Sequence, residues 1–412
     1  MPGRTALRLI AAFGVAALGA GLYWSLGFAY ADLLFWRDAR ESVQRAARLV
    51  PGSSRYQARL AVLLDAEGDH AGAAAALESA LAANPRDAAS WVALGLRREM
   101  DGDSGGAERC LLQAAGVDRT YDPRWALANF YFRRGDRDRF WLWAKRAAEM
   151  ACGDMRPLFR LCWNATEDPA AILSRVIPQR PEVLRQYLAF LLEEGALGPA
   201  ASLAATLAAH AEPEDVPVLL DACDRLLDSQ NAGGSLPVWN ALCARKLIAA
   251  AELSPGQGRC LTNRAFASAP TSRGFDWRLP AVEGVSISRA EANPFLRVSF
   301  SGRQPERCEV LWQYVPLIPG ARHRFEFEYR TSGIEAGGGL RWRISGVIAG
   351  GWKPLADLAD LSSEGWSRGA VAFETPAELR LARLALVYQR APGTTRIEGA
   401  VWLRDLGLGF PP

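Results

Sequence analysis

The sequence predicts a multidomain chain: an all-α solenoid of helical repeats, then an all-β antiparallel sandwich, with one transmembrane helix before both. Three observations predict this order. Residue types recur every 34 positions between Ala39 and Ala115, and apolar residues alternate with polar ones after a Pro/Gly-rich segment at 254–258. An uncharged run also covers Leu9 to Ala31. These patterns are typical of stacked helical hairpins, half-buried strands and a membrane span.

The composition is that of a folded protein, with 50% hydrophobic and 23% charged residues. The formal net charge of +3 is small for 412 residues, and acidic and basic residues are interspersed. We therefore expect no nucleic-acid partner, because such proteins concentrate basic residues on one face. None of the seven cysteines forms a CxxC pair; Cys260 and Cys308 could pair in an exported protein, and their spacing leaves this open.

The N-terminal segment combines a short tail, 1–8, with the apolar run at 9–31. A helix needs roughly 20 apolar residues to cross a bilayer, and the aromatic residues near the end of the run suit the membrane interface. Ala29-Tyr30-Ala31 resembles a signal peptidase site, but the apolar part of a signal peptide has only roughly 7 to 15 residues. The run therefore favours an uncleaved anchor over a cleaved signal peptide.

Small and apolar residues keep fixed positions in the 34-residue period. An alanine or glycine is expected where paired helices cross closely, a glycine where the first helix ends, and a proline where the second stops. The equivalent positions are Ala39, Ala73 and Ala107; Ala46, Ala80 and Ala114; Leu60 and Leu94; Leu77 and Leu111; Ala61 and Gly95; Gly68 and Gly102; and Pro51 and Pro85.

This pattern resembles the tetratricopeptide repeat, a helix-turn-helix unit that stacks into a solenoid. We expect the solenoid over 37–250, with clear repeats at 54–87 and 88–121 and a degenerate one from Trp125. The resemblance implies a groove that binds a partner protein mainly through first-helix residues. The groove candidates are Trp91, Arg98 and Trp125.

The period changes from 3.6 to 2 after a predicted linker at 251–262. From Arg322 to Arg330, charged residues alternate with aromatic ones, as in a strand with one buried face. A similar alternation occurs at 296–300 and at 340–344. Such strands, separated by Gly/Pro turns, predict an antiparallel sandwich over 263–412.

Short motifs in this region resemble carbohydrate-binding modules with the galactose-binding-like jelly-roll fold. The motifs are Asn263-Arg264-Ala265-Phe266, Gly274-Phe275-Asp276-Trp277, Gln313 and Val315 before Pro319-Gly320, Gly365-Trp366, and Leu403-Arg404-Asp405-Leu406. The resemblance covers about 261–410 and implies a glycan-binding module. An acidic calcium ligand often follows the first motif in this family, where the present chain has Ala267. We expect no metal and no other cofactor.

If Leu311, Val315 and Leu317 face the core, Trp312 and Tyr314 must face the opposite side. Beside the polar faces of neighbouring strands, they would form a platform that stacks on a sugar and hydrogen-bonds its hydroxyls. The alternative, equally open, is that both rings pack against the solenoid. The glycan-binding candidates are Trp312, Tyr314, Glu326, Glu328, Arg341 and Arg343, whereas Trp277, Trp342, Trp366 and Trp402 are expected in the core or at turns.

No group of residues predicts catalysis, and we expect no catalytic residue. The three histidines lack convergent partners at motif spacing. Glu326 and Glu328 lie about 7 Å apart on one strand face, a separation that glycosidases also show. A charge ladder with Arg324 and Arg330 is the favoured interpretation of this pair, and a glycan-acting enzyme is the alternative.

We therefore expect a non-catalytic, single-pass scaffold in a bacterial inner membrane that supports assembly or export of a cell-surface polysaccharide. Four arginines follow the span within 37–48 and two precede it, which by the positive-inside rule would keep the body in the cytoplasm. We nevertheless expect the bulk of the chain in the periplasm, because the short basic tail is typical of a signal anchor and modules of the resembled type mostly work outside the cytoplasm. The alternative is a protein-interaction scaffold whose sandwich is purely structural.

Overall fold

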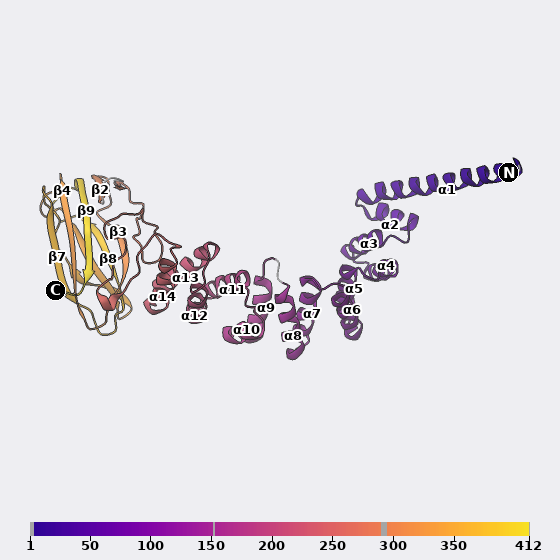
Figure 1. Ribbon diagram of the computed structural model, residues 1–412, viewed down its shortest axis with the longest axis horizontal. Coiled ribbons are helices and arrows are strands. Elements are labelled where there is room, and N and C mark those ends of the chain that lie inside the picture. The colour runs from indigo at the N-terminus through magenta and orange to yellow at the C-terminus, as the bar shows by residue number, and fades with distance from the viewer. Residues whose placement is uncertain (1–3, 151–152, 290–294, 412) are drawn as a thin grey trace. The chain divides into compact units, whose positions relative to one another are not determined.

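A computed structural model describes residues 4–150, 153–289 and 295–411. Tertiary contacts divide the chain into two compact units, Met1–Pro178 and Gln179–Pro412. The described residues of the first unit form helices, and the second unit contains further helices together with a β-sandwich (Figure 1). The predicted fold class, an all-α solenoid followed by an all-β antiparallel sandwich with one apolar N-terminal helix, is confirmed.

The first unit is a stack of helical hairpins. Helices α3 and α4, α5 and α6, and α7 and α8 pair with each other, and α2, α4 and α6 each contact the first helix of the next hairpin. The repeats predicted at 54–87 and 88–121 each form one hairpin. The helices are α1 (Arg4–Trp36), α2 (Arg40–Leu49), α3 (Ser54–Ala66), α4 (His70–Ala83), α5 (Ala88–Met100), α6 (Ser104–Val117), α7 (Tyr121–Arg133), α8 (Arg137–Glu149), α9 (Arg156–Thr166) and α10 (Pro169–Arg175).

The helix ends follow from the local sequence. Asp69, Asp87 and Asp103 each cap the helix that follows, because a carboxylate oxygen accepts a hydrogen bond from the backbone N–H three residues on. Gly68 and Gly102 occupy the intervening turns with φ of 84° and 86°. Glycine adopts this left-handed conformation without steric cost. The 34-residue spacing therefore reflects hairpins of equal length.

Small residues permit the close helix crossings that the sequence predicts. A Cβ atom added to Gly95 would lie 2.9 Å from Cγ of Leu111. A larger side chain at this position would therefore push α5 away from α6. Ala61 occupies the equivalent position in the preceding hairpin and is buried.

Helix α1 extends beyond the predicted span of 9–31 and joins the first hairpin without a break. Its large apolar side chains from Phe13 to Phe28 are exposed, and Ala12–Trp36 is long and apolar enough to cross a membrane. Ala31 and Leu34, by contrast, are buried in one cluster with residues of α2 and α3. The Tyr56 hydroxyl of α3 also donates a hydrogen bond of 2.6 Å to Asp32. The last turns of α1 thus act as a first helix for α2.

The second unit begins with four α-helices and ends with two antiparallel sheets. The five-stranded sheet has the order β1-β2-β9-β4-β7, and the four-stranded sheet has the order β3-β8-β5-β6. The elements are α11 (Pro181–Glu193), α12 (Leu197–Ala208), α13 (Val216–Asp228), α14 (Ala232–Ala244), β1 (Val285–Arg289), β2 (Leu296–Ser301), β3 (Arg307–Pro316), β4 (Arg322–Ser332), β5 (Leu340–Ile348), β6 (Gly351–Asp357), β7 (Ser367–Glu374), β8 (Leu381–Gln389) and β9 (Glu398–Gly409).

The core of the sandwich lies between the inner faces of the two sheets. Phe325 and Phe327 of β4 lie 5.3 and 5.9 Å from Trp342 of β5, measured between ring centroids. Trp277 lies 5.9 Å from the same ring, and all four residues are buried. These contacts confirm the alternation predicted at 322–330 and 340–344.

Cys260 and Cys308, whose pairing the sequence left open, are both free thiols. Cys260 is buried in the sandwich core, and Cys308 is half-buried against it. Burial raises the pKa of both thiols because a thiolate is poorly stabilised away from water. Each behaves as a small apolar residue in this fold.

Candidate functional site

An apolar cleft opens in the first unit between helices α3 and α5. It encloses about 270 Å³, and we call it the repeat cleft. Val62 and Met100 at its rim are 54% and 74% exposed. Exposed apolar side chains beside buried ones mark a surface that another chain can cover. The lining residues are Ala61, Val62, Asp65, Ala73, Leu77, Ala93, Leu96, Arg97 and Met100.

Arg97 supplies the polar contact of the repeat cleft. Its guanidinium donates hydrogen bonds to Asp65 at 3.0 Å and to Asp101 at 3.1 Å, and its side chain is only 9% exposed. Hydrogen bonds from His70 and Arg97 hold the pKa of Asp65 below its usual value. The Nε atom of Arg97 is buried and has no hydrogen-bond partner among the described residues. The contacts with Asp65 and Asp101 hold the Arg97 side chain beside the apolar lining of the cleft.

The three predicted groove residues lie outside the lining of the repeat cleft. The Trp91 indole donates to a backbone carbonyl of the preceding turn at 2.9 Å, and Arg98 pairs with a glutamate of α4 at 3.1 Å. Trp125 stacks on a tyrosine of its own helix. Leu96 and Arg97 line the cleft instead. The sequence feature that could have identified Leu96 and Arg97 is their position directly after Gly95, where α5 crosses α6.

The outer face of the four-stranded sheet carries the predicted aromatic pair. Trp312 and Tyr314 point away from the sandwich core, as expected, but neither ring is open to solvent on both sides. Guanidinium groups of Arg383 and Arg278 lie 3.6 and 4.6 Å from the Trp312 ring centre. Tyr314 is only 5% exposed. A sugar could therefore reach these rings only in part.

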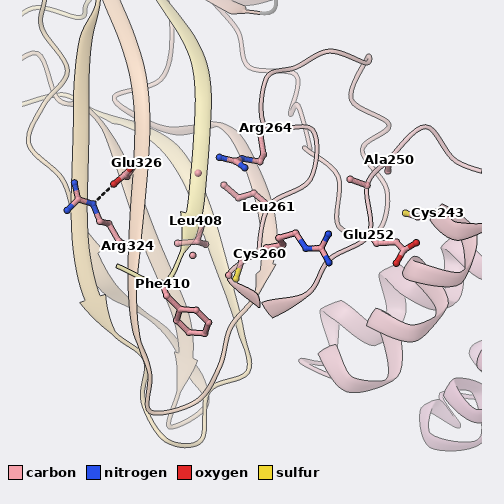
Figure 2. A pocket seen from close by; sticks show the side chains of 15 residues that line it. Cys243, Ala250, Glu252, Cys260, Leu261, Arg264, Arg324, Glu326, Leu408 and Phe410 are labelled. Atoms are coloured by element: carbon pink, nitrogen blue, oxygen red, sulfur yellow. Dashed lines mark ion pairs between the residues drawn. The ribbon is translucent and has the colours of Figure 1, made fainter. Parts of the chain in front are cut away.

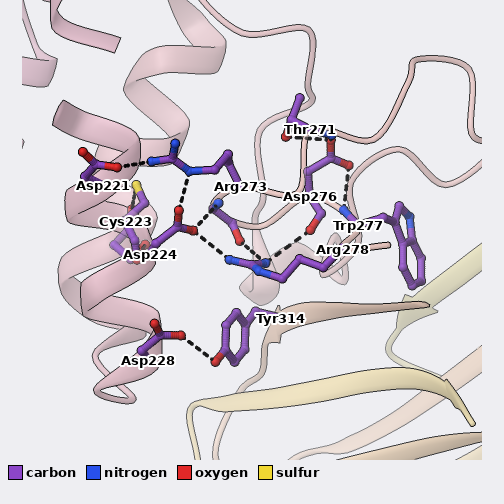
Figure 3. Close-up of polar contacts among 12 residues, drawn as sticks. Asp221, Cys223, Asp224, Asp228, Thr271, Arg273, Asp276, Trp277, Arg278 and Tyr314 are labelled. Carbon is purple, nitrogen blue, oxygen red and sulfur yellow. Dashed lines mark hydrogen bonds and ion pairs between the residues drawn. The ribbon is translucent and has the colours of Figure 1, made fainter. Parts of the chain in front are cut away.

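Helix α13 packs against this part of the sandwich through carboxylate side chains (Figure 3). Asp224 accepts hydrogen bonds from Arg273 at 2.5 Å, from the backbone N–H of Gly274 at 2.7 Å and from Arg278 at 2.7 Å. Asp221 pairs with Arg273 as well. We call these contacts the α13 joint. They explain why the last helices and the sandwich form one compact unit.

Tyr314 takes part in the α13 joint rather than standing free. Its hydroxyl donates a hydrogen bond of 3.0 Å to Asp228, at the end of α13. Burial, together with the charge of Asp228, raises the pKa of Tyr314 to about 12. Of the two alternatives that the sequence left open, packing against the helical region is the one that the structure shows for this ring.

Of the remaining glycan candidates, Arg341 and Arg343 share the four-stranded sheet with Trp312, and Arg343 and Trp312 are both register partners of Ala385. Arg343 pairs with Asp357 at 2.6 Å on the four-stranded sheet, where Arg341 also lies, 3.6 Å from an aspartate. Glu326 and Glu328 belong to β4 of the five-stranded sheet. The two sheets of a sandwich present their outer faces in opposite directions. The prediction that these two glutamates flank Trp312 is therefore wrong.

Glu326 and Glu328 form ion pairs on the five-stranded sheet. Glu326 pairs with Arg324, and Glu328 accepts hydrogen bonds from Arg368 at 2.7 Å and from Arg404 at 2.9 Å. The contacts with Arg368 and Arg404 lower the pKa of Glu328. A glycosidase general acid needs a raised pKa instead. Arg324 takes part in the predicted charge ladder, whereas Arg368 and Arg404, rather than Arg330, pair with Glu328.

A second cleft, of about 860 Å³, lies at one end of the five-stranded sheet (Figure 2). One wall is the chain that follows α14, including Glu252 and Arg264, and the other includes Arg324 of β4. The two walls meet closely because Gly409 has no side chain: an added Cβ would lie 2.5 Å from the carbonyl oxygen of Gly258. We call this the linker cleft. It offers three guanidinium groups and two carboxylates to a polar ligand.

No three His, Cys, Asp or Glu side chains are grouped so as to hold a metal ion within residues 4–150, 153–289 and 295–411. His323 is buried on β4, where its Nδ1 lies 3.0 Å from the Thr375 hydroxyl. Burial lowers the pKa of His323. This environment stabilises a neutral histidine in the structure of the sandwich.

No known family model matches the chain, and no curated protein matches it either. Solved structures match separate parts. A crystal structure of MamA is 24% identical, with a TM-score of 0.27, over 31% of this chain and 74% of that one. A crystal structure of YrrB, described as a TPR protein with an unusual peptide-binding site, is 17% identical, with a TM-score of 0.26. The match covers 50% of this chain and 100% of that one. A structure described as "CBM4 structure and function" is 9% identical, with a TM-score of 0.26. The match covers 33% of this chain and 86% of that one.

Proposed function

We propose that the protein is a non-catalytic scaffold, anchored in a membrane by α1, that binds an apolar segment of a partner protein and presents a glycan-binding sandwich. The observation that carries the proposal is the repeat cleft, which places the exposed apolar side chains of Val62, Leu96 and Met100 around an opening of about 270 Å³. An apolar side chain of the partner would fill the cleft.

The size of the repeat cleft supports a peptide rather than a cofactor. Its volume of about 270 Å³ lies below the roughly 300–1,000 Å³ that is usual for small-molecule pockets. Fully burying a valine, leucine or methionine side chain contributes about 1.5–3 kcal/mol. Burying two or three of them would support reversible binding of a partner segment.

The test is selection of peptides from a random display library against the detergent-solubilised full-length protein. We expect enriched peptides to share a large apolar residue, and Leu96→Arg to weaken their binding at least tenfold. Leu112→Arg is the matched control, because Leu112 is also exposed, at 40%, but lies on α6 outside the cleft. No enrichment, or equal binding by Leu96→Arg and wild type, would contradict the proposal.

The continuity of α1 supports an uncleaved anchor. Cleavage after Ala31 would divide a helix whose last turns are buried against α2 and α3, next to the hydrogen bond between Asp32 and Tyr56. The intact mass of the protein purified from membranes should therefore include residues 1–31. A mature N-terminus at Asp32 would show that α1 is a signal peptide.

The proposed setting is a bacterial inner membrane, with the bulk of the chain in the periplasm, where polysaccharide is assembled or exported. The arginines that follow the span favour the opposite orientation, so orientation needs its own measurement. A reporter enzyme that is active only in the periplasm, fused after Pro412, should be active. Activity of a cytoplasm-specific reporter alone would reverse the orientation and remove the polysaccharide setting.

A further inference from the structure

Tryptophan and arginine side chains alternate on the outer face of the five-stranded sheet. Arg297, Trp402 and Arg330 are register partners across β2, β9 and β4. The Arg330 guanidinium lies 4.4 Å from the ring centre of Trp402 and 5.5 Å from that of Trp366. The Arg404 guanidinium lies 3.8 Å from the Trp366 ring centre. We call these five residues the indole–arginine surface.

Two of the guanidinium groups in this surface have no counter-charge among the described residues. Neither Arg330 nor Arg297 forms an ion pair with any residue in the described part of the chain. The Nε atom of Arg330 is buried and also lacks a hydrogen-bond partner there. An arginine stays charged at all physiological pH values, and a buried donor without an acceptor is costly. The surface therefore favours an acceptor with negative charge.

We propose that the indole–arginine surface binds an anionic glycan, a chain of sugar rings that carries carboxylate groups. This rests on the proposed function, in which the sandwich binds a glycan, and it names the face and the class of glycan. The apolar C–H faces of the sugars pack on the exposed part of Trp366, because the guanidinium groups of Arg297 and Arg330 lie over Trp402. Arg297 and Arg330 donate charge-assisted hydrogen bonds to sugar carboxylates.

The mixture of charges favours a glycan over a nucleic acid. Glu328 and Asp405 lie beside Arg404 in the same surface. A duplex presents one phosphate charge per roughly 1.7 Å of its axis, so a nucleic acid would bring phosphates against these two carboxylates. A carboxylated glycan has sparser charge, and its many hydroxyl groups can donate to carboxylate oxygens.

The same sheet face continues along β4 to the linker cleft. Arg330 and Arg324 both lie on β4 and are separated by roughly 20 Å, at about 3.3 Å per residue. Arg324 and Arg264 line the linker cleft at that end. Positive side chains therefore occur at both ends of the face. A glycan of several rings would contact both, so affinity should rise with chain length.

The experiment measures binding of oligogalacturonates of defined length to the detergent-solubilised full-length protein. Neutral galacto-oligosaccharides of equal length provide the comparison. We expect Arg330→Gln to lower the affinity for oligogalacturonate at least tenfold. Arg330→Lys, which keeps the charge, should lower this affinity less. Arg307→Gln is the control, because Arg307 is exposed at the start of β3 in the four-stranded sheet, away from this face. Its affinity should stay within twofold of wild type.

All variants are first shown to unfold cooperatively, so that a loss of affinity is not a loss of the fold. A loss confined to Arg330→Gln supports the proposal. Equal affinity of Arg330→Gln and wild type overturns the assignment of this face. Binding of the neutral oligosaccharide alone overturns the anionic class but leaves a glycan-binding sandwich. Tighter binding of single-stranded DNA, or of vesicles containing anionic lipid, overturns the choice of a glycan. The peptide selection at the repeat cleft is independent of all these outcomes.

Discussion

The two outer faces of the sandwich carry similar residues but differ in what those residues contact. On the four-stranded sheet, Tyr314 donates to Asp228 and Arg343 pairs with Asp357. On the five-stranded sheet, Arg330 lies close to two indole rings and forms no ion pair with any described residue. Residue type alone therefore does not identify a binding surface. Side chains already paired within the chain contribute to stability, and unpaired ones remain available to a ligand.

The largest expected effect breaks the α13 joint. Asp224→Ala would leave the Arg278 side chain, which is 13% exposed, without its carboxylate partner. We expect the free energy of unfolding to fall by about 2–4 kcal/mol, because removing one member of a largely buried pair strands the other. Denaturant titration followed by tryptophan fluorescence measures the change.

Asp221→Ala is the matched control for this prediction. Asp221 lies on the same helix and, like Asp224, pairs with Arg273. Its side chain, however, is 61% exposed. Removing an exposed ion pair should cost less than about 1 kcal/mol. If Asp221→Ala and Asp224→Ala were equally destabilising, the α13 joint would not depend on the buried contact.

The fold was predictable from the sequence because its signals are local. The turn glycines Gly68 and Gly102 and the alternation at 322–330 each involve residues that are near in the chain, so composition and period were sufficient. The same holds for α1, whose apolar run is continuous. Its junction with the first hairpin was missed, since the hydrogen bond between Asp32 and Tyr56 joins residues on different helices.

The candidate sites were less predictable because they depend on pairing between distant segments. The sequence suggested that β3 and β4 are neighbours, but β3 pairs with β8 and β4 pairs with β9 and β7. In the repeat cleft the error was one position, Arg98 for Arg97. Successive residues of a helix lie about 100° apart around its axis, so one position changes the face. Trp402, expected in the core or at a turn, lies within β9 on an outer face. Successive residues of a strand point to opposite faces, and its neighbours Val401 and Leu403 are the ones that face the core.

A smaller effect concerns Tyr314 and pH. An unfolded tyrosine has a pKa of about 10, and the folded value here is raised to about 12. The stabilisation is therefore complete below pH 10 and is lost as the pH rises toward 12. Tyr314→Phe removes this dependence, so its fall in stability between pH 9 and pH 11 should be smaller than that of wild type by about 1 kcal/mol. If wild type and Tyr314→Phe lost equal stability across this range, the pKa of Tyr314 would not be raised in the folded protein.

The smallest expected effect on stability is at Arg330. An exposed cation–π contact contributes about 0.5–1 kcal/mol, and the side chain makes no ion pair within the described residues. Arg330→Gln should therefore lower the free energy of unfolding by less than about 1 kcal/mol in the same denaturant titration. A loss as large as that of Asp224→Ala would make Arg330 a structural residue and reduce the contrast between the two faces.

Hydroxyl-radical footprinting tests the contrast between the faces most directly, because both carry a tryptophan that solvent can reach. Trp366 of the indole–arginine surface is 37% exposed, and Trp352 of the four-stranded sheet is 44% exposed. Oligogalacturonate added to the full-length protein should lower the oxidation of Trp366 and leave that of Trp352 unchanged. Protection of Trp352 with no change at Trp366 would place the ligand on the opposite face and contradict this account.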